Sequence, residues 1–324
     1  MKHIDKKVSL FLIVCICVSM LTGCSGTVRL PYTSMTGNSS FELLFDTAGR
    51  TDTFAGELCV GDSNVPLENY EIEQVSAAAL FDMKQSDVVY ASNMHEKLYP
   101  ASLTKLLTAL VAINYGSLDQ TLTATNEVYI TQSGAVLAGI KAGDTMTMEQ
   151  ALHLLLIRSA NDVANLIAEN ISGSVESFVE LMNEEAQKLG ATNSHFMNPH
   201  GLHHTDHYTT VYDMYLIFKE AVKYEAITQI IGMSSYSTTY KNKYGSDKNI
   251  SVSTTNAYFN QLYKAPENVT ILGGKTGTTN EAGSCLGLYV KDTSGNPYIA
   301  IILHGNTKDD LYIEMKQLLE QIHR

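Results

Sequence analysis

The sequence is poor in cysteine, and its five cysteines are badly placed for a disulfide framework or a zinc site. Cys15 and Cys17 lie in an N-terminal apolar run and Cys24 follows it, so only Cys59 and Cys285 remain in the rest of the chain. Two thiols so far apart form no framework, and no Cys-x-x-Cys pair indicates zinc. We expect two buried free thiols, and a single bridge between them stays open as the alternative.

Long apolar runs are also lacking, apart from the one at the N-terminus. A basic head, MKHIDKK, precedes VSLFLIVCICVSM, which has the length of a signal-peptide core and is short for a membrane span. It leads into Leu21-Thr22-Gly23-Cys24, which resembles a bacterial lipobox. We therefore predict a lipoprotein signal peptide over residues 1–23 and a lipid on Cys24. An ordinary secretory signal with an incidental cysteine is the alternative.

Basic residues are outnumbered. The chain has 22 Lys and Arg against 34 Asp and Glu; removal of residues 1–23 leaves 19 and 33, a net charge of about −14. Such a balance argues against nucleic acid as a partner and against electrostatic adhesion to anionic lipid. The lipid on Cys24 is then the expected contact with the membrane, at the outer face of the bacterial cytoplasmic membrane.

The rest of the chain predicts one globular unit after a linker. Residues 24–70 are rich in Ser, Thr, Gly, Asn and Asp and are interpreted as a lipidated tether. From residue 71 onward, strand-like runs occur at about 71–97 and 245–324, and mainly helical patterns occur at about 98–244. The order predicts an α+β fold, with a sheet built from both chain ends, an all-helical lobe, and a cleft between them.

Individual patterns within this unit predict its elements. Two β-rich runs around Lys84-Gln85-Ser86 predict a hairpin. A Thr147 cap and strong apolar periodicity predict a helix over residues 147–171, and a third pattern predicts a helix that ends at Gly190. Strands return beyond Ser251, and an amphipathic helix closes the chain.

Ser102 and Lys105 stand at the start of another predicted helix, in LYPASLTKLLTALVAINYG, residues 98–116. A capping serine and a lysine stem lying along the apolar face would explain this short pattern. A nucleophile is the alternative, because a helix N-terminus favours developing negative charge at the serine. Lys105 would lie one turn further along the same face.

Two more short patterns favour the nucleophile. They are the Ser-Ala-Asn of residues 159–161 and the Lys-Thr-Gly of residues 275–277. With the flanking YPASLTK, NPHGL, HYTTVYDM and GKTGTTNEAGSC, the chain from about Val75 resembles the serine D-alanyl-D-alanine carboxypeptidases of the penicillin-binding-protein class (peptidase family S11), relatives of the serine β-lactamases. The resemblance implies a β-lactamase/DD-peptidase-like fold and an active site in the cleft.

The resemblance also implies a role for each motif residue. Ser102 forms an acyl-enzyme, and Lys105, made neutral by burial and by the nearby cation Lys275, takes the serine proton. Ser159 relays a proton to the departing amine, and Asn161 holds the substrate amide. Which base acts first is disputed for such enzymes.

A predicted strand carries the substrate-binding residues Lys275, Thr276, Gly277 and Thr278. An extended peptide can lie beside this strand with its terminal carboxylate on the Lys and Thr side chains, and Gly277 leaves room for the scissile bond. The N–H groups of Thr278 and Ser102 would form an oxyanion hole. The implied substrates are peptidoglycan stem peptides ending in D-Ala-D-Ala, the implied covalent inhibitors are β-lactams, and no cofactor is expected.

A cluster of histidines invites a zinc hypothesis. The segment NPHGLHHTDH contains His200, His203, His204, Asp206 and His207. Its Gly-containing polar context indicates a loop, without the helical spacing of His-Glu-x-x-His, so we predict no metal. His200 falls in the Pro-His-Gly-Leu shared with the family and is expected to line the cleft and bind substrate. The other three histidines are expected to be surface or structural residues.

Three rival functions stay open from the sequence. A serine β-lactamase is the nearest, but no Glu-x-x-Leu-Asn element follows residue 161 to direct a deacylating water. A non-catalytic penicillin-binding sensor would normally be coupled to a membrane-spanning segment, and a zinc DD-peptidase would lose activity to a chelator. The chain stops at its closing helix, so the further β-rich domain and amphipathic anchor of larger family members are not expected.

Overall fold

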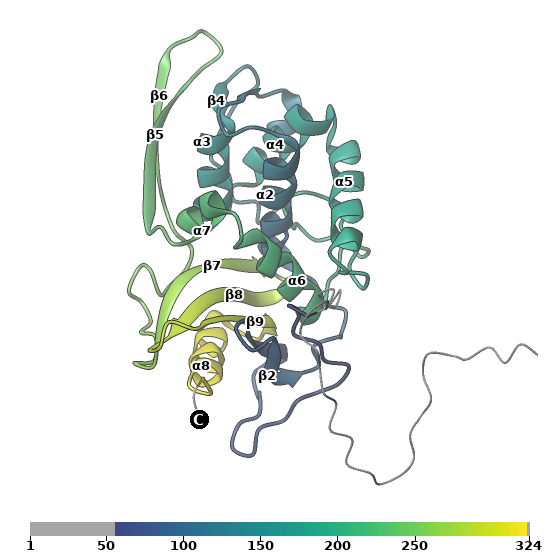
Figure 1. The fold of residues 1–324 in the computed structure, drawn as a ribbon. Helices are drawn as coiled ribbons and strands as arrows, with labels where there is room; N and C mark the ends of the chain where they lie inside the picture. Colours follow the sequence, from purple (N-terminus) through teal and green to yellow (C-terminus); the bar gives the residue numbers. More distant parts are fainter. Residues whose placement is uncertain (1–55, 323–324) are drawn as a thin grey trace, which may run out of the picture. The chain divides into compact units, whose positions relative to one another are not determined.

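The computed structural model describes residues 56–322 (Figure 1). The predicted signal peptide, the predicted lipidation site at Cys24 and residues 25–55 of the predicted tether lie outside this range. Within residues 56–322, no helix combines the length and the apolar character needed to cross a lipid bilayer.

A five-stranded antiparallel sheet is built from both ends of the described chain, as predicted. Its strand order is β2-β1-β9-β8-β7. The strands are β1 (Val75–Asp82), β2 (Asp87–Ser92), β7 (Val269–Thr279), β8 (Gly283–Asp292) and β9 (Pro297–Gly305). The first two form the predicted hairpin. Because β9 pairs with both β1 and β8, the last strand of the chain joins the two halves of the sheet.

Both faces of this sheet are covered, and alternate residues of β9 show it. Ile299, Ile301 and Leu303 belong to the core shared with the helical lobe, whereas Ala300 and Ile302 belong to the core beneath α8 (Lys308–Leu319). Side chains of a strand alternate between faces, so a strand buried on both sides is apolar throughout. Figure 1 shows α8 on one face of the sheet and the lobe on the other.

The segment between the two halves of the sheet carries most of the helices. They are α2 (Thr104–Tyr115), α3 (Met148–His153), α4 (Asn161–Ser172), α5 (Val175–Lys188), α6 (Val211–Ala221) and α7 (Glu225–Ile231). The predicted Thr147 cap is confirmed, and Thr147 and Gln150 form a reciprocal capping box. Ser174 and Thr210 cap α5 and α6 in the same region through their hydroxyls.

The lobe is not all-helical, so this part of the prediction is wrong. It contains a second antiparallel sheet of order β3-β4-β5-β6, with β3 (Thr121–Thr123), β4 (Thr145–Thr147), β5 (Ser235–Lys241) and β6 (Asp247–Ser253). The first two strands have three residues each, too few to give a pattern. The long β5–β6 hairpin is mostly polar and only partly buried, so its alternation resembles a loop.

The continuous helix predicted over residues 147–171 is also broken. After α3 the chain forms a π-helical turn, Leu154–Arg158, and Ser159 takes a left-handed conformation with φ of 67°. Helix α4 begins at Asn161. The apolar periodicity continues on both sides of the break, which is why the sequence pattern does not reveal it.

Residues 56–70 belong to the folded unit and not to a free tether. Cys59 is buried, and its N–H donates to the Tyr215 hydroxyl at 2.9 Å. Val65 exchanges two backbone hydrogen bonds with Ala91 at the edge of the sheet. The described part of the predicted linker therefore packs on the domain through its apolar residues. Cys59 and Cys285 are free and buried, as expected, and burial raises their pKa values to about 11 and about 12.

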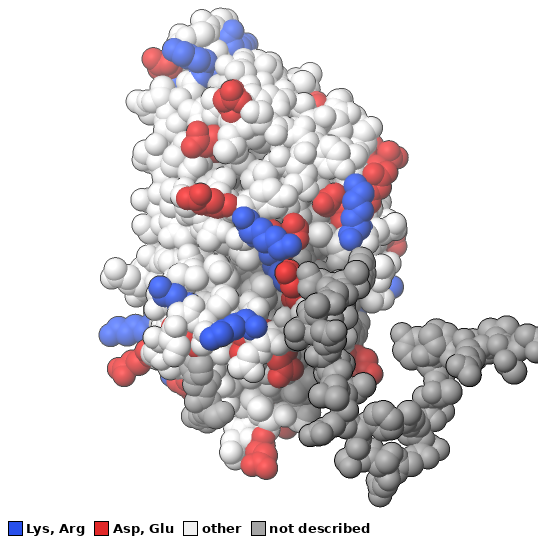
Figure 2. Space-filling view, viewed as in Figure 1, with Lys and Arg blue, Asp and Glu red and all other residues white. Residues whose placement is uncertain are grey.

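Charged side chains of both signs are interspersed on the face seen in Figure 2. Several of the exposed ones form local pairs, including Lys223 with Glu220 and Lys241 with Asp247. Among the described residues this face shows no continuous basic area of the kind that binds a polyanion.

Candidate active site

Ser102 lies in a single turn of 3-10 helix, Ala101–Leu103, directly before α2. Ala101 has a left-handed φ of 46°, and its carbonyl oxygen accepts a hydrogen bond from Thr104 Oγ1 at 2.8 Å. A Cβ on Gly201 would lie 1.9 Å from the same oxygen. Position 201 therefore excludes a side chain, and the turn that presents Ser102 is held between α2 and the loop around Gly201.

Lys105 is fully buried one turn after Ser102. Its Nζ lies 2.9 Å from Ser102 Oγ, 2.7 Å from Asn161 Oδ1 and 2.5 Å from the carbonyl oxygen of His200. The amide and carbonyl oxygens can only accept, so they take two N–H groups. A neutral amine has two N–H groups and one lone pair, which then faces the Ser102 hydroxyl. The contacts suit a neutral lysine that can accept the serine proton.

Burial and a second cation lower the pKa of Lys105 well below its ordinary value of 10.5. Desolvation is the larger cause and the charge of Lys275 is the next, against a smaller opposing effect of Asp162. Lys275 is itself buried, and desolvation lowers its pKa to about 7. Both effects favour the neutral form of Lys105.

Ser159 reaches the site because the main chain breaks there. A left-handed conformation at a residue other than glycine costs on the order of 1 kcal/mol, and it persists here between a π-helical turn and α4. The Ser159 hydroxyl accepts a hydrogen bond from Lys275 Nζ at 2.9 Å. Two residues later, Asn161 contacts Lys105. One short motif thus contacts both buried lysines.

Strand β7 carries residues 275–278 along the free edge of the five-stranded sheet. Its other side pairs with β8. A Cβ on Gly277 would lie 2.9 Å from both the Pro100 carbonyl oxygen and the Ser102 nitrogen. Glycine therefore lets the strand approach the nucleophile, and an extended chain can add to this edge. The N–H of Thr278 as part of an oxyanion hole stays a prediction.

A cavity of about 210 Å³ is lined by Ser102, and we call it the reaction cavity. Its walls include the predicted residues Ser102, Ser159, Thr276, Gly277 and Thr278. The Thr276 hydroxyl shares a 2.5 Å hydrogen bond with that of Thr255. Ser102, Ser159 and two threonine hydroxyls thus lie together, and Lys275 contacts Ser159.

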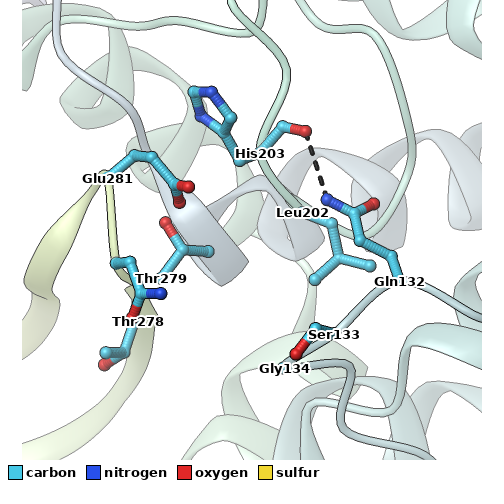
Figure 3. Close-up of a pocket in the computed structure, with 9 residues that line it drawn as sticks. Gln132, Ser133, Gly134, Leu202, His203, Thr278, Thr279 and Glu281 are labelled. Carbon is cyan, nitrogen blue, oxygen red and sulfur yellow. Dashed lines mark hydrogen bonds between the residues drawn. The ribbon is translucent and has the colours of Figure 1, made fainter.

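A second cavity of about 520 Å³ continues beyond Thr278, and we call it the side cavity (Figure 3). Its walls come from the end of β7 and the turn after it, and from two loops of the lobe. The lining residues are Gln132, Ser133, Gly134, Leu202, His203, Thr278, Thr279, Asn280 and Glu281.

The sequence reasoning missed Asp162, which holds the loop above the site. Its carboxylate accepts backbone N–H bonds from residues 138–140 at 2.9, 2.8 and 3.2 Å. Burial raises the pKa of Asp162, and these bonds oppose that rise. An acid directly after the Ser-x-Asn motif, at a helix start, is a signal that could have found it. Thr255 was also missed, and nothing in its surrounding sequence indicates it.

His200 acts through its main chain. Its carbonyl oxygen accepts from Lys105, while its buried ring accepts a hydrogen bond from the Leu202 N–H at 3.1 Å. Burial, and then the charge of Lys105, lower its pKa well below 6.5. The ring lines neither cavity, contrary to the prediction that it lines the cleft. The carbonyl of His200 binds Lys105 directly, so the position still contacts the predicted site.

The other histidines are placed separately from one another. His207 is buried, with Nε2 2.9 Å from Thr104 Oγ1, and serves the turn around Ser102. His204 is exposed, whereas His203 unexpectedly lines the side cavity. Within residues 56–322, no three His, Cys, Asp or Glu side chains lie close enough to hold a metal ion.

Solved DD-peptidase structures share this fold. The DD-transpeptidase of Streptomyces K15 matches with a TM-score of 0.72 at 22% identity, over 79% of this chain and 98% of that one. A penicillin-binding protein homologue from Mycobacterium tuberculosis matches with a TM-score of 0.67 at 24% identity, over 80% of this chain and 94% of that one. At such identities the likeness concerns the fold alone.

The sequence comparison adds the family. Residues 65–307 match the family described as D-alanyl-D-alanine carboxypeptidase, and this chain belongs to that family. D-alanyl-D-alanine carboxypeptidase DacF of Bacillus subtilis is 32% identical over 76% of this chain and 61% of its own length. D-alanyl-D-alanine carboxypeptidase DacC of Escherichia coli is 30% identical over 78% of this chain and 62% of its own length. The chain thus spans about three fifths of the length of these relatives.

Proposed function

We propose that this protein is a serine DD-carboxypeptidase that removes the terminal D-Ala from peptidoglycan stem pentapeptides. The observation that carries the proposal is the contact of Lys105 Nζ with Ser102 Oγ at 2.9 Å, in surroundings that lower the lysine pKa. A serine hydroxyl is a weak nucleophile until a base lies at hydrogen-bond distance. Relatives named D-alanyl-D-alanine carboxypeptidases support the class of reaction.

The first step forms an ester. Ser102 Oγ bonds to the carbonyl carbon of the penultimate D-Ala while the hydroxyl proton passes to neutral Lys105. Backbone N–H groups at Ser102 and Thr278 would stabilise the oxyanion. The C–N bond to the terminal D-Ala then breaks, and the proton held by Lys105 returns to the leaving nitrogen through Ser159. Free D-Ala departs and the shortened peptide stays on Ser102.

The order of residues along β7 supports this orientation of the substrate. Thr276 lines the reaction cavity, and the buried ammonium of Lys275 contacts the Ser159 hydroxyl and the Thr276 carbonyl oxygen, so these two residues suit the terminal carboxylate. The scissile carbonyl then lies beside Gly277, which contacts the Ser102 turn. The acyl part continues along Thr278, as an added antiparallel strand.

In the second step, water attacks the ester while Lys105 takes a water proton and passes it to the departing Ser102 Oγ. The C–O bond breaks, Ser102 is restored, and the tetrapeptide leaves as a carboxylate after losing its acid proton to solvent. A penicillin forms the same kind of ester, but its leaving nitrogen stays tethered and blocks the approach of water. The reaction cavity has no carboxylate among its lining residues to assist that water. We therefore expect β-lactams to be slowly released inhibitors.

One experiment separates the proposal from its rivals. The full chain is incubated with a stem pentapeptide and, separately, with benzylpenicillin, and D-Ala, tetrapeptide and penicilloic acid are quantified with and without a chelator. We expect chelator-independent D-Ala release and slow penicillin turnover. Rapid sustained penicillin hydrolysis without D-Ala release would identify a β-lactamase. Acylation without turnover would identify a sensor, and loss of activity in the presence of the chelator would identify a zinc enzyme.

For localisation, we propose export and a lipid anchor on Cys24 at the outer face of the cytoplasmic membrane. The order of basic head, apolar run and Leu-Thr-Gly-Cys supports it. Mass spectrometry of the membrane-extracted protein should find diacylglyceryl on an N-terminal Cys24, and Cys24→Ala should carry none. A mature N-terminus at another residue contradicts the anchor.

A further inference from the structure

The side cavity lies on the acyl-donor side of the nucleophile. Along β7, the terminal carboxylate is assigned to Lys275 and Thr276, and the scissile carbonyl to Gly277. A substrate that continues in the same direction next passes Thr278 and Thr279, which line the side cavity. Strand residues advance about 3.3 Å each, so the residue that precedes the two D-Ala lies beside the end of the strand. The turn at residues 280–281, which also lines the side cavity, is therefore next to that residue.

The side cavity carries a single carboxylate. Glu281 is the one acidic residue among its lining residues, which include neither lysine nor arginine. Figure 3 shows the Glu281 carboxylate directed toward the space between Thr279 and His203. Within residues 56–322, no lysine or arginine forms a salt bridge with Glu281. The negative charge therefore faces the cavity without an internal counter-ion.

The rest of the cavity suits a short alkyl chain that ends in a polar group. Leu202 provides apolar surface, and Ser133 and Thr279 provide hydroxyl groups. The ring of His203 stands edge-on to the ring of Tyr99, with centroids 4.7 Å apart. The main-chain carbonyl oxygen of His203 accepts a hydrogen bond from the Gln132 side chain at 3.3 Å. Two walls of the cavity are thereby tied to each other.

We propose that the side cavity binds the side chain of the residue preceding D-Ala-D-Ala and that Glu281 selects a side chain ending in a primary ammonium group. A side chain that ends in a carboxylate is disfavoured by the same charge. The inference rests on the proposed carboxypeptidase function, since it assigns a specificity-determining residue to that reaction. Glu281 lies on the surface, so its contribution is that of a solvent-screened ion pair.

The test uses matched acyl-lysyl-D-Ala-D-Ala tripeptides, with the ε-amine free, with it acetylated, and with a carboxylate-ended side chain of similar length. We expect the wild type to have the highest kcat/KM for the free amine. Glu281→Gln should lower that value about three- to fivefold, as the loss of an exposed ion pair predicts, and leave the acetylated substrate unchanged. Glu281→Lys should favour the carboxylate-ended substrate.

Glu267→Gln is the matched control, because this exposed glutamate stands before the opposite end of β7. Equal rates for amine and acetylated substrates in the wild type, or an equal effect of Glu281→Gln on both, would overturn the inference while leaving the carboxypeptidase proposal standing. A second readout is the rate of Ser102 acylation by penicillins whose side chains end in an amine or its acetamide. The acylation rate tests the charge preference even in a protein that releases no D-Ala. Equal acylation rates for the amine and the acetamide would also overturn the inference about Glu281.

Discussion

The reaction cavity and the side cavity meet at Thr278 but are built differently. The first is formed by a helix start, a strained Ser159 and strand β7, and the two lysines that contact its serines, Lys105 and Lys275, are buried. The second is lined largely by loops and a turn, and its carboxylate is exposed. Burial shifts the pKa values of reacting groups, whereas exposed charge is screened by solvent. Substitutions should therefore change rates by orders of magnitude in one cavity and only a few-fold in the other.

The largest effect is expected at Lys105. Replacement by methionine keeps most of the buried volume but removes the base beside Ser102. General-base catalysis is typically worth about 10²–10⁴ in rate, so Lys105→Met should lower the acylation rate by that factor. Stopped-flow measurement with fluorescent penicillin checks it, with a melting curve to confirm folding. Lys264→Met, at an exposed lysine, is the control; a Lys105→Met enzyme within tenfold of wild type would remove Lys105 as the base.

The next effect concerns pH and Lys275. Lys275 is protonated below about pH 7; its charge favours neutral Lys105, and we expect that charge to bind the substrate carboxylate. In the free enzyme, kcat/KM should fall as pH rises through about 7. It should also fall as pH drops through the lowered pKa of Lys105, because a protonated lysine cannot accept the serine proton.

Lys275→Met sharpens this prediction. It should lower kcat/KM about 10- to 100-fold, as expected for a lost hydrogen bond between charged groups. The acid limb should move to higher pH, because Lys105 no longer faces a second cation. A pH profile of kcat/KM for both proteins checks it, and an acid limb that stays in place would contradict electrostatic coupling of the two lysines.

A smaller effect, on stability, is expected at Asp162. Asp162→Asn replaces a buried carboxylate that accepts backbone N–H groups from the loop at residues 138–140. The amide NH₂ cannot accept, so one or more of these donors is left unpaired, at about 1–3 kcal/mol of unfolding free energy. Urea unfolding measures it, with the exposed Asp247→Asn as control. Equal stability of the two variants would show that the loop is held by other contacts.

The smallest effect is expected for Glu281→Gln, and only for substrates with a free side-chain amine. A fall in kcat/KM of tenfold or more for every substrate would mean that the side cavity affects the reaction itself. It would contradict the view that only the reaction cavity changes rates by orders of magnitude.

The sequence predicted the parts of the site that depend on local spacing. Ser102 and Lys105 come together because they are separated by one helical turn, and residues 275–278 because they are consecutive on a strand. Their burial followed from the apolar surroundings. The two buried free thiols and the Thr147 cap were also predicted.

What the sequence did not reveal depends on contacts distant along the chain. The left-handed Ser159 interrupts an unbroken apolar pattern, and the contact of Thr255 with Thr276 joins segments with no shared signal. The role of His200 lies in its carbonyl group, which every residue type possesses, so the histidine pattern pointed to the wrong atom. The β5–β6 hairpin was missed because half-exposed polar strands resemble loops.

The central claim is that Ser102 forms the acyl-enzyme with Lys105 as its base. The most direct test is peptide mapping by mass spectrometry after a brief incubation of the full chain with benzylpenicillin. We predict one penicilloyl group per chain on Ser102, none on Ser102→Ala, and strongly delayed labelling of Lys105→Met. An adduct on another residue, or labelling that survives Ser102→Ala, would contradict the account.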